Sequence, residues 1–237
     1  MRIGSLFSGI GGLELGLEWS GLGETVFQVE KDPYCRRVLA KHWPEVPRFI
    51  DVSTVRGEDL PPCDLLCGGF PCQDISVAGK RVGLSGARSC LWAHFARIVE
   101  EISPRWVVVE NVGHTAKRWV DAISSDLGRL GFSSLALPFS ARMVGAPHVR
   151  SRVFVVAHPE RIQLRKQQGR GWRSCGQDTP QPILLGEDER WQPLPSICRD
   201  DDGVSAWMDR RRLKALGNAV VPQCAEVVGH IIRELGA

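Results

Sequence analysis

The sequence of 237 residues lacks any run of eighteen apolar residues, so it offers no candidate for a membrane-spanning helix. It also lacks internal repeats and low-complexity tracts. Residues 1–7 are expected to form a buried strand rather than a signal peptide, because their apolar stretch is short and no small-residue cleavage site follows. We therefore expect a cytoplasmic protein with one main globular domain and no membrane partner.

The eight cysteines lack the paired spacing of a structural metal site. Cys63, Cys67 and Cys72 lie close together, but no second pair of Cys or His residues accompanies them, since Cys175 and Cys198 are isolated. A chain without an export signal is expected to keep its thiols reduced. The sequence therefore predicts neither a disulfide framework nor a bound metal.

Net charge is small, +3, and does not by itself indicate a nucleic-acid partner. The distribution of charge is more informative. Residues 75–99 contain no acidic side chain but four basic ones, Lys80, Arg81, Arg88 and Arg97. Residues 158–173 carry five basic side chains against Glu160 alone. Local basic patches can contact a phosphate backbone even in a nearly neutral chain, although either patch alone is equally compatible with ordinary solvated loops.

Short apolar runs alternate with helical patterns through the first two-thirds of the chain. The expected strands are Ile3–Phe7, Thr25–Glu30, Arg48–Asp51, Leu65–Gly68, Trp106–Glu110 and Arg152–Ala157. The expected helices are Gly12–Trp19, Pro33–His42, Ser89–Ile102 and Ala116–Leu130. This alternation predicts an α/β fold with a doubly wound, mostly parallel sheet, in which ligands bind beyond the carboxyl ends of the strands.

The alternation stops at His158. Residues 158–206 are rich in Gln, Gly, Pro, Asp and Arg without sustained periodicity, which favours a small loop-rich insertion. A closing helix is expected over Pro222–Leu235, with proline in its first turn. The predicted organisation is one domain built from residues 1–157 and 207–237, interrupted by the insertion.

A glycine-rich segment, Phe7-Ser8-Gly9-Ile10-Gly11-Gly12, separates the first strand from the first helix. Glycines there allow a tight turn and a close approach of the backbone to a ligand, but the spacing differs from that of dinucleotide-binding folds. Acidic residues end the next two strands, Glu30 and Asp51. A carboxylate at the end of the second strand is well placed for ribose hydroxyls, whereas Asp51 is equally suited to capping a helical turn.

Cys72 follows the fourth strand in the loop Gly68-Gly69-Phe70-Pro71-Cys72-Gln73. A cysteine just beyond a strand end, in a Gly/Pro loop, is an accessible nucleophile candidate. Glu110 ends the fifth strand, and if the fourth and fifth strands are neighbours the two residues emerge at the same edge. A structural ion pair is the alternative interpretation of Glu110.

Taken in order, these residues resemble the DNA (cytosine-5) methyltransferase family. The resemblance rests on the glycine-rich segment, Glu30, Asp51, Pro71-Cys72-Gln73, Glu110-Asn111-Val112, Arg150-Ser151-Arg152 and Gly217-Asn218-Ala219-Val220-Val221-Pro222. It covers residues 1–157 and 213–237 and is typical of a compact member of bacterial or phage type. It implies a Rossmann-like fold, S-adenosylmethionine as cofactor, and methyl transfer to carbon 5 of cytosine in flipped-out bases of double-stranded DNA, as part of restriction-modification.

The resemblance also implies residue roles. Catalysis would involve Cys72 as nucleophile, Glu110 as the partner of the ring nitrogen N3, and Arg150 and Arg152 as residues that hold the base or its phosphate. Cofactor binding would involve Phe7, Ser8, Gly9, Ile10, Gly11, Glu30, Asp51, Val52, Asn218 and Val220. DNA contacts would come from Gln73, Ser76, Arg81 and Arg88, and residues 158–206 would recognise the target sequence.

Two other functions remain open at the level of the sequence. A tRNA cytosine-5 methyltransferase on the same scaffold would keep Cys72 and Glu110. A catalytically inactive DNA-binding relative would be expected to have lost one of them, or the cofactor glycines. We expect the protein to act as a monomer, with DNA as its macromolecular partner.

Overall fold

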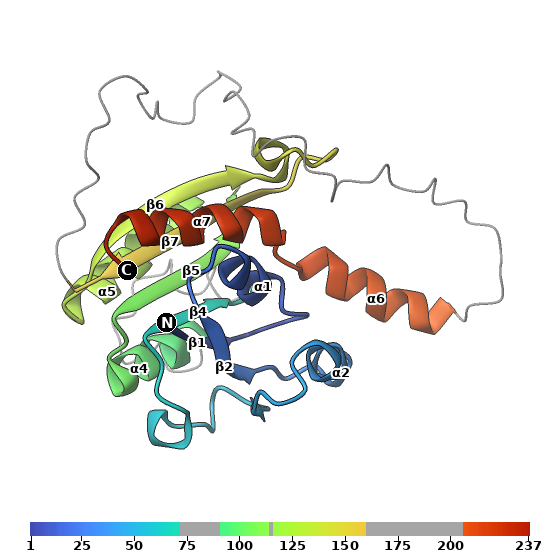
Figure 1. Ribbon diagram of the computed structural model, residues 1–237, viewed down its shortest axis with the longest axis horizontal. Coiled ribbons are helices and arrows are strands. Elements are labelled where there is room, and N and C mark those ends of the chain that lie inside the picture. Colours follow the sequence, from blue (N-terminus) through green and yellow to red (C-terminus); the bar gives the residue numbers. More distant parts are fainter. Residues whose placement is uncertain (72–90, 114–115, 160–205) are drawn as a thin grey trace.

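The computed structural model describes residues 1–71, 91–113, 116–159 and 206–237, with side chains undescribed at 117–118 and 206–210. One seven-stranded sheet forms its centre (Figure 1). The strands are β1 (Arg2–Leu6), β2 (Glu24–Val29), β3 (Arg48–Phe49), β4 (Leu65–Gly69), β5 (Trp106–Val112), β6 (Ser133–Ser140) and β7 (Ser151–His158). The α-helices are α1 (Gly12–Trp19), α2 (Pro33–His42), α4 (Leu91–Ile102), α5 (Ala116–Arg129), α6 (Ala206–Asn218) and α7 (Pro222–Glu234), with short 3₁₀ turns η1 (Gly57–Asp59) and η4 (Ala141–Val144).

The sheet is mostly parallel and doubly wound, which confirms the fold class predicted from the sequence. Its strand order is β3-β2-β1-β4-β5-β7-β6. The first five of these strands run parallel, whereas β7 is antiparallel to both β5 and β6. The chain moves outward in one direction from β1 and in the other from β4, so these two neighbours form the switch point where such folds bind ligands.

Apolar side chains cover both faces of the sheet, as expected for parallel strands. On one face, alternate residues of the central strands pack against Phe95 and Ile98 of α4 and Trp119 and Ile123 of α5. On the other face, the intervening strand residues pack against the apolar sides of α1 and α7. The central strands are therefore buried on both faces.

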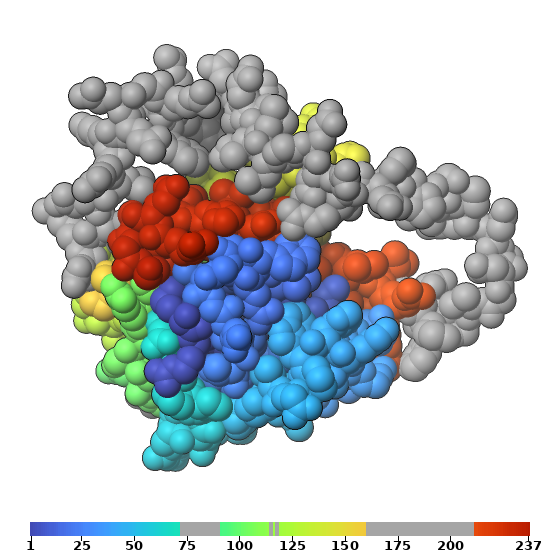
Figure 2. All heavy atoms as spheres, in the orientation of Figure 1, coloured from blue at the N-terminus to red at the C-terminus, as the bar shows by residue number. Residues whose placement is uncertain are grey.

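Helix α1 packs closely against α7 and the segment before it, because two of its glycines face them. A methyl group at Gly12 would collide with the carbonyl oxygen of Val220, and one at Gly16 with the carbonyl oxygen of Pro222. Figure 2 shows the red surface of α7 directly against the blue surface of the N-terminal elements. The close contact brings the segment before α7 onto the first turn of α1.

Most predicted elements are confirmed, with shifts of one or two residues at their ends. Strand β1 ends at Leu6 instead of Phe7, because Phe7 adopts a left-handed backbone conformation with φ of 56°. Strand β6 and helix α6 were not predicted from the sequence. Among the described residues, no helix has the length and apolarity needed to cross a membrane.

Candidate functional site

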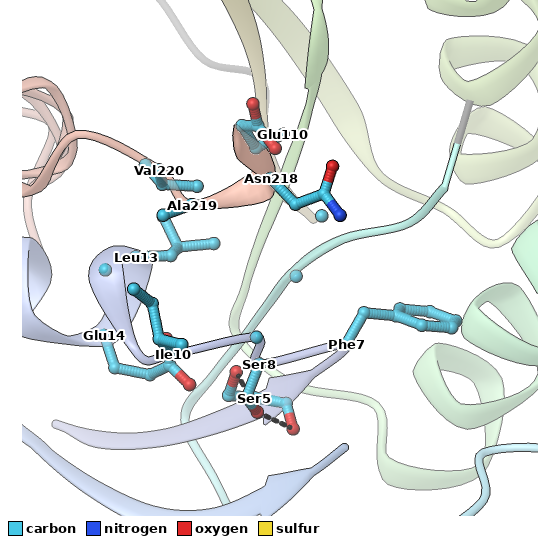
Figure 3. Close-up of a pocket in the computed structure, with 14 residues that line it drawn as sticks. Ser5, Phe7, Ser8, Ile10, Leu13, Glu14, Glu110, Asn218, Ala219 and Val220 are labelled. Carbon is cyan, nitrogen blue, oxygen red and sulfur yellow. Dashed lines mark hydrogen bonds between the residues drawn. The ribbon is translucent and has the colours of Figure 1, made fainter. Parts of the chain in front are cut away.

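A pocket lies at the carboxyl ends of β1, β4 and β5, at the switch point of the sheet (Figure 3). Seven of the residues predicted for cofactor binding or catalysis line it together: Phe7, Ser8, Gly9, Ile10, Glu110, Asn218 and Val220. The remaining lining residues are Ser5, Gly12, Leu13, Glu14, Gly68, Gly69 and Ala219. The pocket therefore combines residues from four segments that are far apart in the sequence, 5–14, 68–69, 110 and 218–220.

The glycine-rich turn after β1 forms one wall of this pocket. Phe7, Gly9 and Gly11 have φ values of 56°, 58° and 88°, so the chain reverses tightly before α1 begins. No heavy atom lies within 4 Å of the position where a side chain at Gly9 would begin. This open space above a backbone turn is what a ligand needs for close approach. The ring of Phe7 stacks toward Phe95, with 6.5 Å between centroids.

Glu30 is joined to the glycine-rich turn by a hydrogen bond. Its Oε2 accepts from the N–H of Gly9 at 2.7 Å, and its Oε1 accepts from the N–H of Asp32 at 2.7 Å. Burial raises the pKa of Glu30, against the opposing effect of these two donors. The carboxylate thus fixes the turn and stands next to the pocket without being one of its lining residues.

Asp51 and Val52 do not line the pocket either. One carboxylate oxygen of Asp51 accepts from the backbone and hydroxyl of Ser53, and the other pairs with Lys31 at 3.0 Å. Hydrogen bonding to Ser53 and to Lys31 lowers the pKa of Asp51. The carboxylate therefore caps the turn that follows it, which is the alternative that the sequence left open. Val52 is buried, and its carbonyl accepts from Arg97.

Glu110 lies in the buried part of β5, directly opposite Gly69 of β4. Its Oε1 lies 2.8 Å from Nε of Arg152, and its side chain is only 8% exposed. Burial raises the pKa of Glu110 to about 7, although the positive charges of Arg152 and Arg150 act in the opposite direction. A carboxyl group with that pKa is well suited to holding or giving up a proton near neutral pH.

Asn111 connects the end of β5 to the loop that carries Cys72. Its side-chain Nδ2 donates to the backbone carbonyl of Phe70 at 2.9 Å, while its side-chain Oδ1 accepts from the backbone N–H of Val112. This contact fixes the chain two residues before Cys72. Cys72, Gln73, Ser76, Arg81 and Arg88 themselves lie outside the described residues.

Arg150 holds the segment that closes the pocket from the side of α6. Its guanidinium donates to the carbonyl oxygens of Gly217 and Ala219, at 2.6 and 2.7 Å. These bonds fix the end of α6 and the turn before α7, from which Asn218 and Val220 enter the pocket. Arg152, two residues later, faces Glu110 instead. The two arginines thus stabilise different walls of one site.

Ser5 and Glu14 also line the pocket, and neither was predicted as a site residue from the sequence. Glu14 is fully buried on α1, and neither carboxylate oxygen has a hydrogen-bond partner among the described residues. A sequence signal existed: Glu14 precedes Leu17 by three residues and therefore shares its buried helical face. The described residues contain no cluster of three or more potential metal ligands.

A mostly parallel α/β sheet with a glycine-rich turn and a buried acid at neighbouring strand ends defines a cofactor-binding α/β enzyme fold. Residues 1–181 match the family model of C-5 cytosine-specific DNA methylases, and the chain belongs to this family. The assignment confirms the resemblance inferred from the sequence, including S-adenosylmethionine as the family's methyl donor.

Curated relatives are bacterial Type II methyltransferases. M2.BsuMI of Bacillus subtilis is 38% identical over 66% of this chain and 42% of its own length. M.HhaI of Haemophilus parahaemolyticus is 32% identical over 71% of this chain and 52% of its own. M.NgoBI of Neisseria gonorrhoeae is 30% identical over 90% of this chain and 64% of its own length. The chain spans about half the length of the curated relatives it matches.

Solved structures with the same fold include a prophage-encoded DNA modification methyltransferase from E. coli. It is 29% identical, with a TM-score of 0.55, over 67% of this chain and 46% of that one. The Dnmt2 methyltransferase of S. pombe has a TM-score of 0.59 at 20% identity, over 69% of this chain and 53% of that one. The second likeness concerns the fold alone.

Proposed function

We propose that this protein transfers a methyl group from S-adenosylmethionine to carbon 5 of cytosine in double-stranded DNA, through a covalent adduct with Cys72. The observation that supports this proposal most is the buried Glu110–Arg152 pair beside Gly69, three residues before Cys72. It combines an acid of suitable pKa with a fixed position at the edge where the nucleophile loop begins.

In the proposed reaction the thiolate of Cys72 adds to carbon 6 of cytosine, which makes carbon 5 nucleophilic. Glu110 donates a proton or a strong hydrogen bond to N3, where negative charge would otherwise accumulate. When bound, S-adenosylmethionine supplies the methyl group that carbon 5 takes up. Solvent water then takes the carbon 5 proton, and the electron pair of that C–H bond forms the C5=C6 double bond and expels Cys72 as thiolate. Glu110 takes its proton back from N3 in the same step.

Arg152 has two roles in this proposal. Its Nε holds one oxygen of Glu110 and thereby orients the carboxyl group toward the pocket. Within the part of the chain that the structure describes, its terminal nitrogens make one hydrogen bond, from Nη1 to the carbonyl of Ser151. They are suited to the exocyclic oxygen or a phosphate of the flipped nucleotide. Arg150, in contrast, is assigned to the loop that carries Asn218 and Val220.

The pocket residues fit an S-adenosyl cofactor. The open backbone turn at Gly9 allows close approach of an amino-acid chain, and Phe7 offers an aromatic face. Glu30, fixed by the backbone N–H groups of Gly9 and Asp32, would accept hydrogen bonds from the ribose hydroxyls with its remaining lone pairs. Asp51 and Val52 would contact the adenine from the next strand end. Asn218 and Val220 would contact the cofactor from the end of α6 and the segment before α7.

DNA would bind across this edge of the sheet. Gln73, Ser76, Arg81 and Arg88 are proposed to contact it from the nucleophile loop, and residues 158–206 are proposed as the target-recognition region of a domain formed by 1–157 and 207–237. A basic segment without acidic residues, 75–99, supports phosphate contacts there. Bacterial Type II relatives support a role in restriction-modification. A location in the cytoplasm and action as a monomer are further parts of the proposal.

Methylation assays with tritiated S-adenosylmethionine test this proposal. The 237-residue chain is incubated with duplex DNA and, separately, with total tRNA, and the labelled nucleoside is identified after digestion. We expect 5-methylcytosine in DNA, a loss of about 10²-fold or more for Glu110→Gln, and an unchanged rate for Glu58→Gln, an exposed acid outside the pocket. Label in tRNA alone would support the alternative enzyme, and no label in either would support a binding module.

A further inference from the structure

The pocket contains a second buried acid, Glu14, that the proposed chemistry does not use. Glu14 lies on the first turn of α1 and points toward Ser5 and Ser8 beneath the glycine-rich turn (Figure 3). It lines the pocket although none of its surface is exposed to solvent. Neither of its oxygens has a partner with hydrogen-bond geometry among the described residues.

The charges around the pocket are unequal. Its lining contains two acids, Glu14 and Glu110, and no lysine or arginine. Arg152 compensates Glu110 at 2.8 Å, whereas no described cationic side chain reaches Glu14. The titratable groups that do act on Glu14 are Glu18 on the same helix and Cys67 on β4, and neither brings a positive charge.

A buried carboxylate without a counter-charge is costly, and proteins keep one where a ligand supplies the missing charge. Burial raises the pKa of Glu14 to about 7, and the hydroxyls of Ser5 and Ser8 reduce this effect only in part. A cation placed next to it would recover the lost interaction. S-adenosylmethionine carries two positive groups, the sulfonium and the α-ammonium of its methionine part.

We propose that Glu14 is the residue that recognises the α-ammonium group of the cofactor's methionine part. The inference rests on the proposed function, since it assumes an S-adenosyl cofactor in this pocket. The α-ammonium is the better match because it has three N–H donors, whereas the sulfonium has none. Ser5 and Ser8, which bond to each other at 2.9 Å, would orient the carboxylate from below.

Ligand binding separates this role from a structural one. S-adenosylhomocysteine retains the α-ammonium, and a deaminated analogue replaces it by hydrogen while keeping the rest of the molecule. For Glu14→Gln at pH 8 we expect binding of S-adenosylhomocysteine to weaken by about 10- to 100-fold, the usual range for a lost charge-assisted hydrogen bond. Binding of the deaminated analogue should change by less than about twofold, because that ligand never used the charge.

Glu18→Gln is the matched control. It removes a carboxylate one turn further along α1 that bonds to Thr25 and Trp43 and does not line the pocket. It should leave the preference for S-adenosylhomocysteine over the deaminated analogue at its wild-type value. Equal losses of both ligands in Glu14→Gln, or no loss of either, would overturn the assignment.

Calorimetry in buffers of different ionisation enthalpy gives a second readout. At pH 6 the ligand-free Glu14 is largely protonated, so binding of S-adenosylhomocysteine should release close to one proton in the wild type and none in Glu14→Gln. Equal proton release by both proteins would contradict the inference. A wild type that binds no S-adenosylhomocysteine at all would refute the proposed function itself and the inference with it.

Discussion

Replacing Glu14 by glutamine should stabilise the ligand-free protein at alkaline pH. Glu14 is completely buried, and burial raises its pKa from 4.5 to about 7. A carboxyl group whose pKa is raised on folding contributes its full share of stability below pH 4.5. That contribution is lost as the pH rises toward 7, because the folded state resists ionisation. Glutamine has nearly the same shape and no charge to bury.

The magnitude follows from the difference in pKa. At about 1.4 kcal/mol per pKa unit, a rise from 4.5 to about 7 corresponds to about 3 kcal/mol at pH 8. For a chain of this size such a gain raises the midpoint of thermal unfolding by about 6–12 °C. Near pH 4.5 the two proteins should differ by less than about 1 kcal/mol, because both side chains are then largely neutral.

Urea unfolding of cofactor-free protein at pH 4.5 and pH 8 measures this difference directly. Any contribution of Glu110 is common to both proteins and cancels. Glu18→Gln should show no stabilisation at either pH, since it loses bonds to Thr25 and Trp43. Equal stabilities of wild type and Glu14→Gln at pH 8, or a gain of the same size at both pH values, would refute the idea of a costly buried charge.

Further predictions concern the walls of the pocket. Above pH 7 the ratio of the wild-type methylation rate to that of Glu110→Gln should fall by about tenfold per pH unit, because only the protonated Glu110 can donate to N3. A ratio that stays constant with pH would contradict the role of Glu110 as proton donor. Arg150→Ala should weaken S-adenosylhomocysteine binding by about tenfold in calorimetry, because the carbonyls of Gly217 and Ala219 lose their hydrogen-bond donor. Unchanged affinity would show that this loop does not contribute to cofactor binding. Asn111→Leu should lower the methylation rate more than cofactor affinity, because its amide fixes Phe70; an effect on affinity alone would contradict this reasoning.

The parallel half of the sheet was predictable because its apolar runs and turn residues repeat regularly. Glu110 and the Cys72 loop could be placed at one edge from strand order alone, and the pairing of β4 with β5 confirms that neighbourhood. Strand β6 was missed because Pro138 interrupts an otherwise apolar run, a feature tolerated at the edge of a sheet. Helix α6 was missed because its sequence is mostly polar and shows little amphipathic pattern.

The site shows where a sequence pattern stops being informative. Glycines 9 and 11 are visible as a turn, but the contacts of Arg150 with Gly217 and Ala219 join residues 67 and 69 positions apart and follow no local rule. Similarly, no described cationic side chain lies next to the carboxylate of Glu14, and this property depends on how the surrounding elements pack. Such properties arise from tertiary packing, which periodicity and spacing do not encode.

Duplex DNA that contains 5-fluorocytosine at the target position tests the central claim most directly. Fluorine cannot leave carbon 5 as a proton does, so the bond between Cys72 and carbon 6 should persist after methyl transfer. Mass spectrometry of the digested complex should then find the fluorinated, methylated base attached to the peptide containing Cys72, and no adduct with Cys72→Ser. Label on another residue, or methylated DNA without any protein adduct, would contradict the covalent mechanism.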